Sequence, residues 1–298
     1  MLNLERRALK IRTIIIVTVA LLLLYPSAIF AETRDTSEEY INFKNIHGLE
    51  IPEEDYIKLR KVFTEPYLAV MTKEEYFDKM THINFDNVKT QEKYLKLMYD
   101  NRTGETTSTV VTEDEYLNSG NVVMPLNSYY ELSYIYVAVD MSREGEEFVY
   151  GSVDVIWYAQ PVVRSFDVIG IRTVNMSVIN GTQGGKQIYK TDGDYQAIDY
   201  MYNGTNTKNF DNGFGISMNL VNPDVTYLQC SIDSIFEITN FPAIGFGAYE
   251  HANKNFTLAQ SQTYTLASTG KGDVFYFPSE SIRKHYSELE GIHEYFLE

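Results

Sequence analysis

Cysteine is almost missing from this chain, since Cys230 is the single one among 298 residues. An intrachain disulfide is therefore excluded, and the fold has to draw its stability from a hydrophobic core. The 44% content of hydrophobic residues permits such a core. Cys230 lies in a stretch where apolar residues alternate with polar ones, and no histidine partner is suggested nearby, so we expect a buried, unreactive thiol.

Histidine is also scarce, and the five histidines do not have the spacing of a zinc motif. The chain has no Gly-x-Ser-x-Gly sequence, and its glycine-rich stretches lack the spacing of a phosphate-binding loop. These absences predict no metal site, no cofactor and no catalytic residue that a motif identifies. They favour a protein that is not an enzyme.

Basic residues are outnumbered, with 25 Lys and Arg against 41 Asp and Glu and a formal net charge of −16. Residues 1–31 hold four of the basic residues and one of the acids, so the remainder carries −19. A surface this negative repels nucleic-acid phosphates and anionic lipids. We expect no nucleic-acid partner, and membrane contact only through the N-terminal segment if it stays uncleaved.

The N-terminus has the three parts of a secretory signal. Basic residues from Arg6 to Arg12 precede an apolar run over residues 14–24, and the segment closes on the small residue Ala31. Residues 1–31 are therefore predicted to be a signal peptide, and the remainder to be secreted or extracellular. Ile29 weakens the cleavage site and Pro26 weakens a spanning helix, so release and tethering by an uncleaved N-terminal helix both stay open.

Residues 32–120 form a polar, helical N-terminal region in this interpretation. Four short sequence phrases begin at Thr36, Pro52, Thr72 and Thr112. Each phrase consists of a residue that favours a helix start, followed by acidic residues and a tyrosine. In three of them a threonine lies three residues before an acid, which is the spacing of a capping box. The fourth has proline, which is favoured in the first turn of a helix. Each phrase predicts the start of a helix.

From residue 129 onward the hydrophobic period changes to two, which is typical of strands. The predicted strands are residues 130–140, 148–158, 164–173, 186–190, 196–202, 214–220, 226–238 and 262–267. Asn-Gly and Asp-Gly pairs supply turns between several of them. We expect a mainly β protein with a helical N-terminal part (α+β), whose residues 121–278 form an antiparallel β-sandwich or jelly-roll-like domain. Residues 279–298 are predicted to form a C-terminal helix that Ser279 caps.

Three segments carry a resemblance to known proteins: residues 71–76 (Met-Thr-Lys-Glu-Glu-Tyr), 161–172 (Pro-Val-Val-Arg-Ser-Phe-Asp-Val-Ile-Gly-Ile-Arg) and 212–220. With these segments the chain resembles an uncharacterised family of exported proteins of low-GC Gram-positive bacteria. The resemblance implies export and a Gram-positive source, and it implies no activity, cofactor or catalytic residue. A disulfide-poor exported chain agrees with that source.

Tyrosine is abundant, with 24 residues in a chain that is 14% aromatic. The candidate ligand-binding residues are Tyr130, Tyr134, Tyr136, Tyr200 and Tyr202, which alternate along two predicted strands. Aligned rings give a large contact area with a polar edge, which suits recognition of a glycan or a peptide. The other interpretation is that they are half-buried strand residues, because strands favour tyrosine.

Three acids, Asp154, Asp167 and Asp233, lie inside predicted strands. Two of them facing each other across a concave sheet would permit general acid–base chemistry, whereas acids that face solvent would not. Two functions therefore stay open. The first is a non-catalytic extracellular interaction protein that recognises a glycan or another surface protein. The alternative is a secreted hydrolase of polysaccharide or cell wall that uses paired carboxylates.

Overall fold

Alternating apolar residues and frequent turns produce a fold of long antiparallel strands. The computed structural model describes residues 43–119, 129–158, 160–221, 225–267 and 273–296, all within the unit Ile41–Glu298. The predicted signal peptide and the phrase that begins at Thr36 lie outside the described residues. Among the helices that the structure describes, none has the length and apolar character needed to cross a membrane.

The larger sheet contains eight of the described strands, all in antiparallel pairs. They are β3 (Val88–Asp100), β4 (Glu105–Val111), β5 (Tyr130–Glu144), β6 (Phe148–Trp157), β8 (Met176–Val178), β9 (Gly184–Lys190), β10 (Tyr195–Met201) and β13 (Tyr227–Ile238). The order is β10-β9-β13-β6-β5-β3-β4, and β8 pairs with β13 beside this path. Strands β5 and β6 form a hairpin, as the sequence predicts.

The smaller sheet has the order β11-β12-β7-β14-β17 and is also antiparallel. Its strands are β7 (Phe166–Val174), β11 (Thr207–Phe210), β12 (Gly213–Asn219), β14 (Ala243–Ala252) and β17 (Tyr286–Phe296). The two sheets pack against each other, which confirms the predicted mainly β sandwich.

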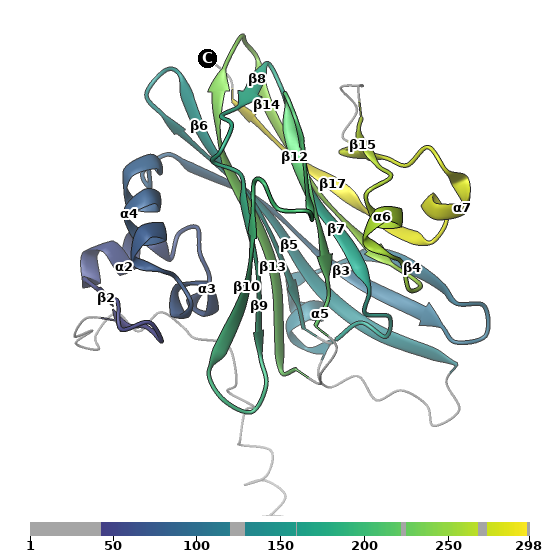
Figure 1. Ribbon diagram of the computed structural model, residues 1–298. Coiled ribbons are helices and arrows are strands. Elements are labelled where there is room, and N and C mark those ends of the chain that lie inside the picture. Colours follow the sequence, from purple (N-terminus) through teal and green to yellow (C-terminus); the bar gives the residue numbers. More distant parts are fainter. Residues whose placement is uncertain (1–42, 120–128, 159, 222–224, 268–272, 297–298) are drawn as a thin grey trace, which may run out of the picture. The chain divides into compact units, whose positions relative to one another are not determined.

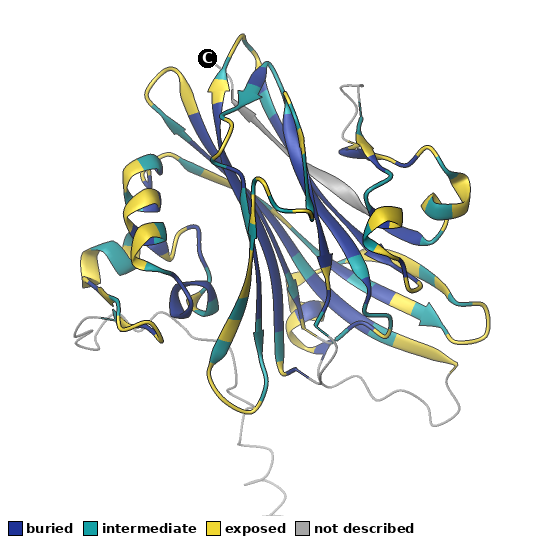
Figure 2. Ribbon diagram, in the orientation of Figure 1, coloured by how far each residue is buried: buried dark blue, intermediate teal, exposed yellow. Residues whose placement is uncertain are grey.

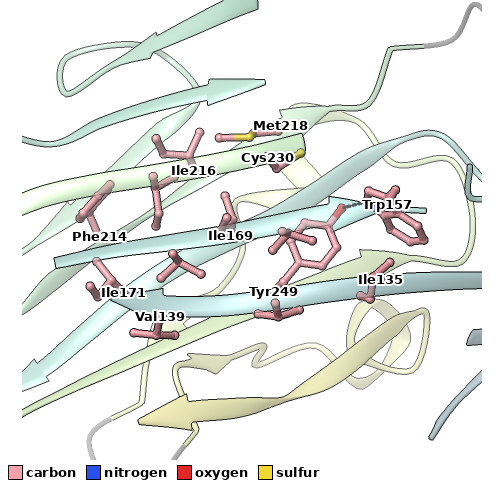
Figure 3. Packing of buried hydrophobic residues seen from close by; sticks show 14 of the residues in the cluster. Ile135, Val139, Trp157, Ile169, Ile171, Phe214, Ile216, Met218, Cys230 and Tyr249 are labelled. Atoms are coloured by element: carbon pink, nitrogen blue, oxygen red, sulfur yellow. Dashed lines mark hydrogen bonds between the residues drawn. The ribbon is translucent and has the colours of Figure 1, made fainter. Parts of the chain in front are cut away.

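The core lies between the sheets, where alternate residues of facing strands interdigitate (Figure 3). Trp157 is 1% exposed, and its Nε1 donates a hydrogen bond of 3.2 Å to the Tyr249 hydroxyl. Cys230 is fully buried in the same cluster, and burial raises the pKa of its thiol well above the ordinary value. The expectation that Cys230 is buried in the core is confirmed.

The N-terminal helices cover the outer face of the larger sheet (Figure 1). This helical layer consists of α2 (Glu53–Leu59), α3 (Glu65–Ala69) and α4 (Lys73–His82), with the short strands β1 (Phe43–Lys44) and β2 (Glu50–Ile51). Its apolar side packs on Tyr150 and Ile188 of the sheet. The capping box at Thr72 is present in full, and Thr112 caps α5 (Glu113–Leu117) through the amide of Glu115.

The outer face of the smaller sheet is covered by a segment near the C-terminus. The segment contains α6 (Leu258–Ser261), β15 (Thr265–Leu266), β16 (Phe275–Tyr276) and α7 (Glu280–Arg283). Its aromatic residues, among them Phe256, Tyr264 and Phe277, pack against Val168 and Phe246 of the sheet. Large parts of the strands of both sheets are therefore buried (Figure 2).

Two segments that the sequence predicts to be helical contain strands instead. Within the region 32–120, which we predicted to be helical, residues 88–111 form β3 and β4 of the larger sheet. Within the tail, predicted as a helix over residues 279–298, only α7 is helical, and residues 286–296 form β17 on the edge of the smaller sheet. The backbone pairing that β5 and β14 offer outweighs the local helical pattern in both places.

Candidate functional site

A cavity of about 210 Å³ lies between the helical layer and the outer face of the larger sheet. Residues 60–64, which connect α2 to α3, form its cover. Thr90 of β3, Tyr136, Ala138 and Asp140 of β5, and Asp154 of β6 form the rest of the lining. The volume is below that of pockets that enclose a drug-sized ligand, so it suits one small ring or side chain.

The polar floor of the cavity follows from the period of the strands. In β5, Val137 and Val139 face the core between the sheets, so Tyr136, Ala138 and Asp140 face the helical layer. Asp154 lies opposite Ala138 on β6, which makes it the diagonal neighbour of Asp140. Diagonal neighbours on one face of an antiparallel pair are about 7–8 Å apart, and slightly less at Cβ.

Asp140 is 3% exposed and accepts a hydrogen bond from the Thr90 hydroxyl. Burial raises the pKa of Asp140 to about 8, even though the bond from Thr90 lowers it; the negative charges of Asp154 and Glu92 raise it further. Asp140 is therefore mostly protonated near neutral pH.

Asp154 is 4% exposed, and neutral groups hold one of its oxygens in place. The Gln229 side-chain amide donates to Asp154 Oδ1 at 2.7 Å, and the Ser231 hydroxyl donates to the same oxygen. Burial raises the pKa of Asp154 to about 6, in spite of these two bonds. The cover takes part in this network, because the Thr64 hydroxyl donates to Gln229 Oε1 at 2.7 Å.

Two basic residues lie at the rim and bind backbone carbonyls there. Arg60 Nη1 donates to the carbonyl of Phe63 at 2.9 Å, and Lys61 Nζ donates to that of Phe85 at 3.0 Å. Lys61 also lies 3.5 Å from the exposed carboxylate of Asp86. These contacts fix the shape of the cover.

Two buried lysines, Lys79 and Lys186, form ion pairs that link the helical layer to the sheet. Lys79 of α4 is 7% exposed at its side chain and pairs with Asp233 of β13. Lys186 of β9 lies 3.1 Å from Glu75 of α4 and 2.5 Å from Asp199 of β10. The cavity is therefore adjacent to a polar interface between two packed layers.

Three of the five predicted tyrosines share one face of β5, the face that also carries Asp140. Tyr130 is 36% exposed, and its hydroxyl accepts a bond of 2.9 Å from Arg102 Nη2. Tyr134 is buried, and Tyr136 lines the cavity, where its hydroxyl donates to Glu92 Oε2 at 3.0 Å. Of these three, Tyr136 lines the cavity described above.

The other two predicted tyrosines lie elsewhere. Tyr200 of β10 packs against the core cluster, and its hydroxyl accepts a bond of 3.3 Å from Gln187 Nε2. Tyr202 follows β10 and is half-buried, and its carbonyl accepts a bond from the side chain of Asn209. The structure therefore does not bring the five tyrosines together on a single face.

Of the three strand acids considered from the sequence, two are neighbours on one face and the third lies elsewhere. Asp154 and Asp233 lie on one face of neighbouring strands, but Asp233 is engaged by Lys79. Asp167 is fully buried between the sheets and binds Tyr249 and His251, the latter at 2.8 Å. The cavity that His251 lines has a volume of about 10 Å³, room for about one water molecule.

Sequence reasoning missed Asp140 and the cover formed by residues 60–64. Asp140 ends the predicted strand 130–140 and is in phase with Tyr134 and Tyr136, so the period of two already placed it on their face. The contribution of the cover was not predictable, since it depends on how the helical layer docks onto the sheet.

Comparison with known proteins gives no match, either to a protein-family model or to a curated protein. The described residues contain no group of three or more His, Cys, Asp or Glu side chains arranged to hold a metal ion.

Proposed function

We propose that the chain is an exported binding protein that recognises a small polar ligand, a sugar unit of a glycan, in the cavity under residues 60–64. The observation that supports this proposal is a cavity lined by an aromatic ring and by convergent polar groups, a combination that small-ligand sites use. Tyr136 offers apolar area, while Thr90, Asp140 and Asp154 offer hydrogen bonds to hydroxyl groups.

Hydrolysis of a polysaccharide is the second candidate, and a specific observation favours it. The pKa of Asp140 is raised to about 8 and that of Asp154 to about 6, so near neutral pH one carboxyl is mostly protonated and the other mostly ionised. A neutral acid beside a carboxylate is the combination that glycoside hydrolysis uses. Asp140 would then be the general acid, and Asp154 the base or nucleophile.

Binding is tested with residues 32–298, a glycan array and isolated cell-wall fragments. The expected result is retention of a glycan without release of reducing sugar. Ala138→Leu places a larger side chain in the cavity and is expected to abolish retention. Ala259→Leu, on an exposed position of α6, is the matched control and should bind normally.

The result identifies which of the two functions holds. Failure to retain any glycan, or equal retention by Ala138→Leu, contradicts the proposed site. Release of reducing sugar that Asp140→Asn and Asp154→Asn each abolish would replace binding by hydrolysis.

The export part of the proposal follows from residues 1–31 and from the resemblance to exported proteins of low-GC Gram-positive bacteria. Expression in such a host, followed by mass spectrometry of the mature chain, checks it. A chain that begins at Glu32 indicates release, and a membrane-bound chain that still contains Arg6 and Arg7 indicates a tether. Recovery of the full-length chain from the cytoplasm contradicts export.

A further inference from the structure

The larger sheet ends in a strand whose outer edge is open. In the order β10-β9-β13-β6-β5-β3-β4, β4 is the last strand, and within the part of the chain that the structure describes it pairs with β3 alone (Figure 1). Residues 107–110 are exposed, Val110 by 54%. An edge strand presents a row of backbone N–H and C=O groups that can pair with another chain. The edge of β4 therefore offers a place where a further strand can add.

The hydrogen-bond ladder shows which backbone groups of β4 point outward. The amide of Asn101 donates to the carbonyl of Tyr129 at 2.9 Å, which continues the pairing of β3 with β5. Because neighbouring residues of a strand direct their backbone groups to opposite sides, Asp100 and every second residue before it point to β4. Their partners on β4 are Glu105, Thr107, Thr109 and Val111. The groups that point away from the sheet belong to Thr106, Ser108 and Val110.

The sequence of β4 lacks the residues that protect an open edge. Native proteins usually place charged residues or proline on such strands, which discourages pairing with other chains. The sequences of the other end strands of the two large sheets each contain a charge, for example Asp199 in β10, Lys208 in β11 and Glu290 in β17. Residues 106–112 (Thr-Thr-Ser-Thr-Val-Val-Thr) contain neither a charge nor proline, and threonine and valine favour strands. This stretch therefore favours pairing with a further strand.

Acids lie at both ends of the uncharged stretch. Glu105 begins β4, and residues 113–115 (Glu-Asp-Glu) form the first turn of α5 after it. In the turn before β4, Arg102 pairs with Asp100 at 2.7 Å, which leaves the charge of Glu105 in excess. At the other end, Lys96 lies 3.4 Å from the last of the three acids of α5, which leaves two in excess. A partner strand with basic residues near its ends complements this pattern.

The same charges disfavour a second copy of this chain as the partner. Antiparallel pairing of β4 with the β4 of another copy would bring the turn 100–105 of one chain beside residues 111–115 of the other. Both segments carry an excess of acids, and the whole chain has a formal net charge of −16. Like charges that meet across paired strands are destabilising. A different polypeptide with basic residues is therefore the better complement.

We propose that the outer edge of β4 is a docking site for an extended segment of another protein, which adds to the larger sheet as a further strand. The centre of this segment consists of uncharged residues that favour strands, and basic residues flank it. Its backbone bonds to Thr106, Ser108 and Val110, as in other cases of recognition by strand addition. None of these three residues lines the cavity under residues 60–64, so the proposal does not depend on glycan binding.

The test uses residues 32–298 and three fluorescein-labelled peptides of equal length. The first has a centre of alternating Thr and Val with two lysines at each end. The second has the same centre with two glutamates at each end, and the third has the lysines around a centre of Gly and Ser. Fluorescence anisotropy at physiological salt measures binding. The first peptide is expected to bind at least about tenfold more tightly than either of the others, because it alone combines strand-forming residues with complementary charge.

Ser108→Pro tests the backbone contact. Proline lacks the N–H group, and the N–H of Ser108 points away from β3, so the pairing of β4 with β3 is retained. The variant is expected to bind the first peptide at least about fivefold more weakly, whereas the matched control Ser108→Thr keeps the N–H and should bind normally. Hydrogen exchange of the unmodified chain tests the same contact without a variant. The amides of Thr106, Ser108 and Val110 should exchange more slowly when the first peptide is bound.

Several results would overturn the proposal. Equal binding of the peptide with glutamates contradicts the charge pattern, and equal binding of the Gly and Ser peptide shows attraction by charge alone. Failure of all three peptides to bind, or slower exchange at a different strand, contradicts the site itself. A dimer of the chain without peptide in sedimentation velocity, which Ser108→Pro abolishes, would assign the edge to a second copy instead.

Discussion

At the scale of single residues, Asp140 combines a strongly raised pKa with almost complete burial. Its pKa is raised to about 8, compared with about 4 in an unfolded chain. Between about pH 4 and 8, the folded protein therefore keeps a proton that the unfolded chain has already lost. Stability contributed by this proton is present at low pH and is lost as the pH rises toward 8.

Asp140→Asn is expected to change how stability depends on pH. The amide has the shape of the protonated acid and still accepts the bond from Thr90, but it does not ionise. The variant should therefore gain stability relative to the original chain as the pH rises from about 6 to 8, by about 2 kcal/mol in total, and the gain should level off above about pH 8.

Urea unfolding followed by the fluorescence of Trp157, the single tryptophan, measures this difference. Asp192→Asn, at an exposed turn, is the control and should follow the original chain at every pH. A constant difference between Asp140→Asn and the original chain over the whole range would show that Asp140 is ionised in the folded state.

At the scale of elements, the sequence predicted those strands that alternate clearly and are bounded by turns. Residues 130–140 and 148–158 correspond to β5 and β6, and 226–238 corresponds to β13. Strand β3 was missed because Lys, Gln and Glu interrupt its apolar residues, and its pairing with β5 is a tertiary contact. The C-terminal strand β17 was predicted as helix, because the local sequence does not show that the edge of β14 is available for strand pairing.

Strand β14 was not predicted either, and its glycines explain why. Gly245 and Gly247 replace the large apolar residues that a buried strand usually shows, because the larger sheet approaches them closely. A Cβ at Gly247 would lie 2.5 Å from Val139 Cγ2 and 2.6 Å from Val153 Cγ2, both in the core. The glycine pattern of β14 therefore reflects the close packing of the two sheets and not the intrinsic β-propensity of this strand.

Gly247→Ala is therefore expected to lower the free energy of unfolding by about 1–3 kcal/mol, since the stiff valine side chains have to shift. Gly193→Ala is the matched control, because a Cβ there meets nothing within 4 Å. This control should stay within about 0.5 kcal/mol of the original chain. Equal stability of the two variants in urea unfolding would mean that the sheets do not approach as closely as the structure shows.

At the scale of the whole molecule, the cavity exists because the helical layer and the sandwich are packed together. The sequence predicted that both helices and strands occur, and the spacing of a capping box located two of the helices. The docking of one layer on the other depends on contacts between distant residues, such as Lys79 with Asp233, which are 154 positions apart. A contact between residues so far apart leaves no local sequence pattern. The cavity therefore could not be predicted from the sequence.

Lys79→Met tests how strongly the two layers are coupled. The substitution leaves Asp233 buried without its charge partner, which typically costs about 3–5 kcal/mol. Because Lys79 belongs to α4 and Asp233 to the sheet, the loss should weaken the attachment of the helical layer more than the core between the sheets. Circular dichroism at 222 nm follows the helices, and the fluorescence of Trp157 follows the core.

The two signals are expected to change together during urea unfolding of the original chain. In Lys79→Met the helical signal should be lost at a lower urea concentration than the fluorescence signal. The double variant Lys79→Met/Asp233→Leu removes both charges and should bring the two transitions together again, because an apolar pair can replace a buried ion pair at little cost. Coinciding transitions in Lys79→Met, at the midpoint of the original chain, would show that this ion pair does not hold the cover over the cavity.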